Sequence, residues 1–140
     1  MTYFFSDIQS EHFFFLTKEC HGPLGMQSGA IRDHQLIASS EKDNSSSVRY
    51  ARLHYANKKK PQSWVPLLDH RDQWLQVSLG NELTWVTGVA TQGKQGKRGA
   101  WVKKFLLKYW GAGVRAQLYK GHGDIHSKVS EIENNPWARV

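Results

Sequence analysis

The sequence predicts an all-β domain, a sandwich or jelly-roll, and three observations lead to that prediction. Short runs of alternating apolar and polar residues recur along the chain, separated by turn-forming segments. Aromatic residues, which favour strands, make up 12% of the chain. Apolar residues with a helical period are scarce. A chain of 140 residues is long enough for one domain with its own core.

The clearest expected strand is 74–80, "WLQVSLG". Leu75, Val77 and Leu79 alternate there with polar residues, as in a half-buried strand. Alternation is weaker in 113–121, which is also expected to be a strand.

Two more strands are expected at 85–91 and 101–110, and the Trp and Phe residues of this pattern are expected in the core. The side chains that share one face in these strands are Trp85, Thr87 and Val89 in the first, and Trp101, Phe105, Leu107 and Tyr109 in the second. The last twenty residues indicate no clear element.

Three polar loops separate the strands. They are "SSEKDNSSS" at 39–47, "HYANKKKPQS" at 54–63 and "QGKQGKRGA" at 92–100. The second contains three adjacent lysines, and the third carries glycine at every third position. These loops interrupt the apolar strands with basic, glycine-rich surface, which is typical of surface offered to a partner.

Positive charge is concentrated in the middle of the chain, which carries a net charge of +7. Twelve of the 19 basic residues are Arg49, Arg52, Lys58, Lys59, Lys60, Arg71, Lys94, Lys97, Arg98, Lys103, Lys104 and Lys108. Only Asp69, Asp72 and Glu82 are acidic in that stretch. Such a field attracts sulfated glycans, anionic lipid or nucleic acid, the alternative being a solvated face without a partner. Nucleic acid is disfavoured because the loops offer hardly any aromatic side chain on which bases could stack.

Enzyme motifs are weak. The segment "GVATQGKQ" nearly matches a phosphate-binding loop, but Gln95 stands where Ser or Thr is needed, so the match is attributed to chance. His122, Asp124 and His126 alternate and could bind zinc or iron, although an exposed polar loop is the favoured interpretation. Cys20 and His21 are too close in sequence for the usual catalytic geometry. No catalytic residue, metal site or cofactor is therefore predicted.

The N-terminal segment is not expected to be a signal peptide. Acidic residues interrupt it, and its longest apolar run, Phe13–Leu16, is only four residues. Cys20 is the only cysteine, so no intrachain disulfide is possible.

The chain from Cys20 to Trp110 resembles the discoidin domain, also called the coagulation factor 5/8 type C domain. The matching blocks, in order, are "CHGPLGMQSGAIRDHQLIASS", "ARLHY", "SWVPLLDHRDQWLQVSLG", "VTGVATQG" and "WVKKFLLKYW". The resemblance implies an eight-stranded antiparallel jelly-roll over 20–140 after an N-terminal extension, 1–19, with the pattern clear only over 20–110. It also implies that Trp64, Trp74, Leu75 and Val77 are core and that Gln76 is a framework position.

Members of this family are extracellular adhesion modules and not enzymes. Loops at one end of their jelly-roll bind phospholipid head groups, carbohydrates or proteins such as collagen. By the resemblance, Ser39–Arg49, Asn57–Ser63 and Gly93–Gly99 are those loops here.

Two departures from the family pattern bear on the kind of ligand and on whether the domain is closed in the usual way. The first two loops lack the large apolar tip residues that insert into membranes, which favours an anionic glycan or an acidic protein surface. After Trp110 the closing strands are atypical or truncated, and Cys20 has no second cysteine to pair with. Either the chain is a truncated or alternatively spliced piece, or its divergent tail supplies replacement strands.

The sequence therefore predicts a non-enzymatic recognition module, extracellular or at the cell surface, that binds carbohydrate, including anionic glycan. Peripheral binding to anionic phospholipid membranes, or to an extracellular protein, is the alternative, and a metal-dependent enzyme at positions 122–126 is a third hypothesis. The expected ligand-binding residues are Arg49, Lys58, Lys59, Lys60, Lys94, Lys97 and Arg98.

Overall fold

The computed structural model describes residues 2–6, 22–57, 60–82, 84–94, 99–111, 113–120, 129–131 and 137–139. The regular elements of the described chain are mostly strands, with three short 3-10 turns at Asp33–Gln35 (η1), Asn44–Ser46 (η2) and Val48–Tyr50 (η3). This agrees with the all-β prediction.

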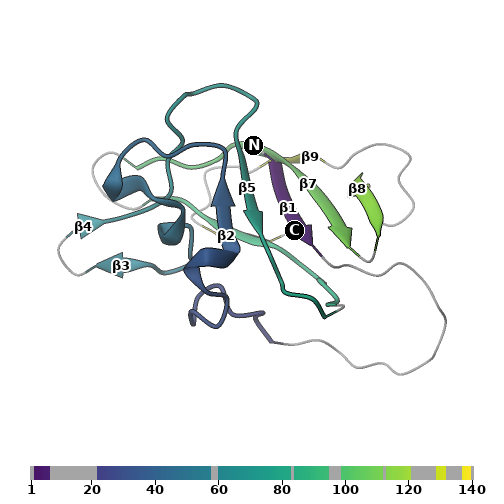
Figure 1. The fold of residues 1–140 in the computed structure, drawn as a ribbon. Helices are drawn as coiled ribbons and strands as arrows, with labels where there is room; N and C mark the ends of the chain where they lie inside the picture. Colours follow the sequence, from purple (N-terminus) through teal and green to yellow (C-terminus); the bar gives the residue numbers. More distant parts are fainter. Residues whose placement is uncertain are drawn as a thin grey trace.

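The largest sheet has the strand order β2-β5-β1-β7-β8, and β9 also pairs with β7 (Figure 1). Its strands are β1 (Thr2–Ser6), β2 (Leu36–Ala38), β5 (Trp74–Val77), β7 (Lys104–Gly111), β8 (Val114–Leu118) and β9 (Val129–Glu131). The pairs β2–β5, β7–β8 and β7–β9 are antiparallel. By contrast, β1 lies between β5 and β7 and is parallel to both.

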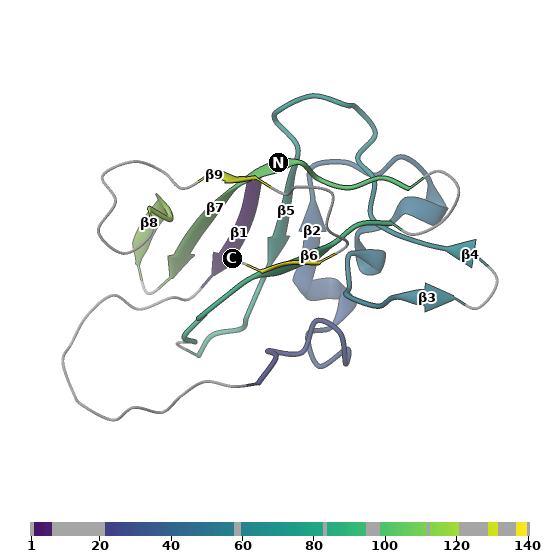
Figure 2. The ribbon, with the colours of Figure 1, turned by 180° about the vertical axis from the view of Figure 1, so that it is seen from behind.

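Two smaller strand pairs complete the described structure. β6 (Ala90–Gln92) pairs with β10 (Trp137–Arg139), and Figure 2 shows this pair crossing in front of the large sheet. β3 (Ala56–Asn57) pairs with β4 (Lys60–Pro61) in a hairpin that projects away from the sheet (Figure 1). The three sheets, as far as the chain is described, do not join into a closed barrel.

The core lies on one face of β2 and β5. Leu75 and Val77, at alternate positions of β5, are each 2% exposed and pack with Leu36 and Ile31. Half-buried Trp64 and Val89 pack against this cluster, so the segment that leads into β6 covers part of it. The alternation of 74–80 thus predicted the core correctly, with Gln76 half-buried and paired opposite Ile37.

The C-terminal tail takes part in the sheets. Val129–Glu131 forms β9 against β7, and Trp137–Arg139 forms β10 against β6. These are strands that the sequence pattern did not reveal. Cys20 and Phe13–Leu16 lie outside the described residues.

Candidate ligand-binding cleft

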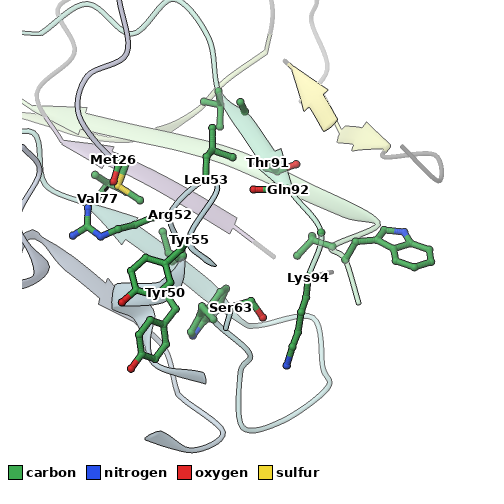
Figure 3. A pocket seen from close by; sticks show the side chains of 18 of the residues that line it. Met26, Tyr50, Arg52, Leu53, Tyr55, Ser63, Val77, Thr91, Gln92 and Lys94 are labelled. Atoms are coloured by element: carbon green, nitrogen blue, oxygen red, sulfur yellow. Dashed lines mark hydrogen bonds between the residues drawn. The ribbon is translucent and has the colours of Figure 1, made fainter. Parts of the chain in front are cut away.

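A cavity of about 1180 Å³ opens between the core face of the large sheet and the loops around it. Among the apolar residues that line it, Val77 is buried, and Met26 and Leu53 are half-buried. Tyr50, Tyr55, Ser63 and Lys94 also line it and are drawn on the side away from Met26 (Figure 3), and this side, where Tyr55 is exposed, is called its mouth. The cavity therefore has an apolar interior and a mouth that combines aromatic, hydroxyl and cationic groups.

Arg52 fixes the loop on one side of the mouth. Its side chain is 7% exposed, and one guanidinium nitrogen donates to the backbone oxygens of Met26 and Ile31, at 2.7 and 2.8 Å. A second nitrogen donates to Asp33 at 2.6 Å. Because all these bonds involve a charged donor, they tie 26–33 to 50–55 more firmly than neutral hydrogen bonds would.

The backbone turn at His54 positions a tyrosine pair. His54 has a φ of 56°, in the left-handed region that non-glycine residues seldom adopt. Its N–H donates to the Gln92 side chain at 2.7 Å, which holds the turn against β6. The ring centroids of Tyr50 and Tyr55 then lie 5.0 Å apart, tilted by 48°. Tyr55 is exposed and Tyr50 half-buried, so the pair presents aromatic surface to solvent at the mouth.

Arg49 places a cation beside this pair. Its guanidinium carbon lies 5.2 Å from the centroid of the Tyr50 ring, within the range of a cation–π contact. The Arg49 side chain is exposed. Its remaining N–H donors thus face water, where an anion could reach them.

The acidic side chains of the first loop accept hydrogen bonds from residues of the same loop. Asp43 accepts from the backbone N–H and the hydroxyl of Ser45, at 2.8 and 2.7 Å. Glu41 accepts from the N–H of Val48 at 2.6 Å and from the Ser47 hydroxyl at 3.0 Å. Both carboxylates therefore hold the two 3-10 turns, η2 and η3, and position Arg49 at the end of the loop.

Asp43 gives a testable pH dependence. The hydroxyls of Ser45 and then Ser46 hold the pKa of the Asp43 carboxyl below its usual value, and the Ser45 N–H and the charge of Lys42 add to this, against an opposing effect of desolvation. Since the folded-state pKa is lowered, the stabilisation is present above the unfolded-state pKa and is lost as pH falls through the folded one.

We expect the Ser45 amide chemical shift to titrate with a midpoint below that of Asp in a short peptide, and the titration to vanish in Asp43→Asn. A midpoint equal to the peptide value would show that the hydrogen bonds do not persist in solution.

A buried polar group fixes the other side of the cleft. Gln73 is 6% exposed, and its side-chain oxygen accepts from the Ser39 and Ser40 hydroxyls at 2.8 and 2.7 Å. The Trp64 indole N–H donates to the Ser40 carbonyl at 2.9 Å. These bonds tie 62–73, which lines the cavity, to the end of β2.

Lys94 stands at the opposite edge of the mouth. Its backbone N–H donates to the Ala100 carbonyl at 2.8 Å, closing an isolated bridge at the base of the glycine-rich loop. The half-buried side chain lines the cavity and forms no ion pair with any residue that the structure describes.

Comparison with known proteins decides the family. The family model described as "F5/8 type C domain" matches residues 35–139, three quarters of the chain. The chain belongs to the F5/8 type C family. This confirms the resemblance and the all-β fold that it implied.

Relatives of the F5/8 type C domain include large proteins. The chain is 35% identical to neuropilin-2 of Rattus norvegicus over 121 residues, which are 84% of this chain and 12% of the relative. It is 39% identical to coagulation factor VIII of Sus scrofa over 114 residues, 79% of this chain and 5% of that protein. A third relative, the venom prothrombin activator omicarin-C non-catalytic subunit of Oxyuranus microlepidotus, is 38% identical over 94 residues, 64% of this chain and 6% of the relative. The chain therefore matches only a small part of these relatives.

Among the basic residues predicted to bind ligand, the structure places three. Arg49 lies on Tyr50, Lys94 lines the cavity, and Lys60 lies in β4 opposite Asn57. Lys58, Lys59, Lys97 and Arg98 lie outside the described residues.

The tyrosine pair was missed from the sequence. Tyr50 precedes the "ARLHY" block and Tyr55 is its last residue, and their only signal was their position at the ends of polar loops. The expectation that Trp residues of the strand pattern are core was wrong for two of them. Trp85 is 62% and Trp101 46% exposed, because strand β6 begins only at Ala90 and β7 only at Lys104, so neither residue lies in a strand.

The described residues contain neither a membrane-spanning helix nor a cluster of metal-ligating side chains. None of the helices described is long and apolar enough to cross a bilayer. Within the described ranges, no three His, Cys, Asp or Glu side chains gather as a metal site. His122, Asp124 and His126 lie outside these ranges.

Proposed function

We propose that this F5/8 type C domain is a non-catalytic, extracellular recognition module that binds a sulfated carbohydrate at the mouth of the cleft. One observation carries the proposal: an accessible tyrosine pair, with Arg49 stacked on it, borders the same cavity as Lys94. The name of the omicarin-C relative, a non-catalytic subunit, supports a binding role.

The chemistry of the mouth suits such a ligand. The C–H face of a sugar ring packs on an aromatic face, which Tyr55 offers. Guanidinium and ammonium groups bind sulfate oxygens through charge-assisted hydrogen bonds, which Arg49 and Lys94 supply. Because Glu41 and Asp43 are already engaged in the loop, they compete less for these cations. We propose that Lys58, Lys59, Lys60, Lys97 and Arg98 extend the basic surface.

The test compares two double charge reversals in the folded domain. Arg49→Glu with Lys94→Glu is expected to weaken binding to a heparin-type sulfated glycosaminoglycan by about a hundredfold, since each lost charge-assisted contact is worth roughly tenfold. Arg115→Glu with Lys120→Glu makes the same change in net charge at exposed positions that do not line the cavity. This control is expected to weaken binding only a few-fold. Affinities are measured by calorimetry at two salt concentrations.

Equal losses in the two double variants would contradict the proposal, because the charge field alone would then explain binding. Tyr55→Ala separates stacking from charge. It is expected to weaken binding about tenfold at high salt, where the electrostatic contribution is screened. An unchanged affinity at high salt would exclude a stacking role for Tyr55.

A second candidate, membrane attachment, is favoured by one observation. Leu67 and Leu68 are neighbours in the segment before β5 and are 58% and 54% exposed. Adjacent exposed leucines can insert into a lipid interface, which the polar first two loops could not do. Pelleting with phosphatidylserine vesicles at high salt tests this. Binding that survives salt and is lost in Leu67→Ser/Leu68→Ser would establish insertion, and complete loss with salt would exclude it.

A further inference from the structure

The cavity exposes apolar surface that the described residues leave uncovered. Eight large hydrophobic residues of the described chain are exposed. Six of them line this cavity: Leu24, Tyr55, Leu67, Leu68, Trp85 and Trp101. A cavity of about 1180 Å³ exceeds the typical size of small-ligand pockets, whereas protein interiors hold few voids larger than a water molecule. The exposed apolar surface therefore indicates that a ligand binds in this cavity.

The cavity also reaches into the core. Ile31, Leu75 and Val77 belong to its lining although they are only 5%, 2% and 2% exposed. Little of their own surface is open, so they form the floor of the cavity, and the apolar surface that a ligand can touch belongs mainly to the exposed residues named above. A slender apolar group, such as an alkyl chain, could lie along this recess, whereas a folded partner with a flat surface could not enter it.

Charge at the cavity is mostly positive. Lys42, Lys94 and Lys103 line it and form no ion pair with a described residue. Among its described lining residues the one carboxylate belongs to Asp69, which is exposed. Arg52 also lines it but is paired with Asp33. The lysines thus complement an anionic group attached to an apolar body.

We infer that the cavity binds a single-chain amphipathic anion, with the alkyl chain along the core face of β5 and the anionic head at the lysines. This site differs from the proposed glycan site in needing the apolar interior and not the tyrosine pair. Its occupant is a dissolved small molecule, which also distinguishes it from attachment to a membrane surface. A bound alkyl chain would cover the apolar surface that the sheets leave open.

The experiment titrates lipid-stripped protein with straight-chain carboxylates from hexanoate to dodecanoate, below their micelle concentrations. Binding is followed by the shift in melting temperature and by quenching of Trp fluorescence with bromine-labelled dodecanoate. We expect affinity to rise by about tenfold for every two methylene groups, as burial of alkyl surface requires. Quenching is expected because Trp85 and Trp101 line the cavity. Trp85→Phe/Trp101→Phe is expected to lose part of the quenching while keeping the melting shift, because Trp64 also lines the cavity and packs on its core side.

Control ligands and variants test the contributions of the anionic head and of the alkyl chain separately. Dodecanol has the same chain without the charge and is expected to bind at least about tenfold more weakly than dodecanoate. That preference is expected to disappear in Lys42→Gln/Lys94→Gln/Lys103→Gln. Val89→Trp, which places a large side chain in the cavity, is expected to weaken dodecanoate binding at least about tenfold. Ile37→Gln changes an exposed residue outside the cavity and is expected to have no effect.

Three outcomes would overturn the inference. Affinity that does not depend on chain length would show that the interior is not used. Equal binding of dodecanol and dodecanoate would remove the role of the lysines. A protein that sediments as a dimer and gives neither a melting shift nor quenching would show that a second copy covers the cavity. None of these results bears on glycan binding, which the charge-reversal experiment tests separately.

Discussion

Replacing Arg52 with alanine is expected to lower the free energy of unfolding by about 3–5 kcal/mol. The substitution removes the charged donor that satisfies the backbone oxygens of Met26 and Ile31 and leaves those carbonyls without it. It also leaves Asp33 without its cation, although that carboxylate is 64% exposed and contributes less. The loop 50–55 would lose its anchor, so Tyr50 and Tyr55 would lose their arrangement as well.

Urea denaturation followed by circular dichroism measures the loss. Arg49→Ala is the matched control, because it removes an exposed arginine three positions earlier and is expected to cost less than about 1 kcal/mol. Arg52→Lys keeps the charge but cannot reproduce the fork of two nitrogens, so an intermediate loss is expected. An Arg52→Ala loss as small as that of Arg49→Ala would show that the guanidinium does not hold the loop.

The second large effect is expected in the core. Leu75→Ala should lower the free energy of unfolding by about 2–5 kcal/mol, because it removes apolar atoms that are 2% exposed and pack among Ile31, Leu36 and Val77. Leu75 also lines the cavity, so water could enter the space and reduce the loss toward the lower limit.

Ile37→Ala is the control for Leu75→Ala. Ile37 lies in the neighbouring strand β2 but is 49% exposed, and its truncation is expected to cost less than about 1 kcal/mol. Equal losses for the two variants in thermal and urea unfolding would indicate that β5 does not carry the core.

The sequence was most informative where local pattern and burial agree. The alternation in 74–80 located β5 and its two buried residues. Residues two apart in a strand lie on the same face of the sheet, so an alternating pattern shows which face is buried. The run 101–110 likewise located β7, although that strand begins at Lys104 and leaves Trp101 outside the sheet. The basic charge of Arg49 and Lys94 was also readable from the sequence.

Other features depend on contacts distant in sequence. The Tyr50–Tyr55 pair requires a left-handed turn at His54 and a hydrogen bond from the far residue Gln92, neither of which a local pattern specifies. The exposure of Trp85 depends on how little strand forms before Ala90. The role of Arg52 was hidden because its partners are backbone carbonyls, which carry no sequence signal.

The position of β1 has a consequence for the order of folding. In the large sheet, β2–β5 on one side and β7 with β8 and β9 on the other are joined through β1. Thr2 pairs with both Trp74 and Leu106, so β1 meets both of its partner strands only after residues 74–77 and 104–111 have been synthesised. Contacts this distant in sequence slow folding. The two halves can form early as antiparallel units, but they become one cooperative sheet only when the N-terminus docks between them.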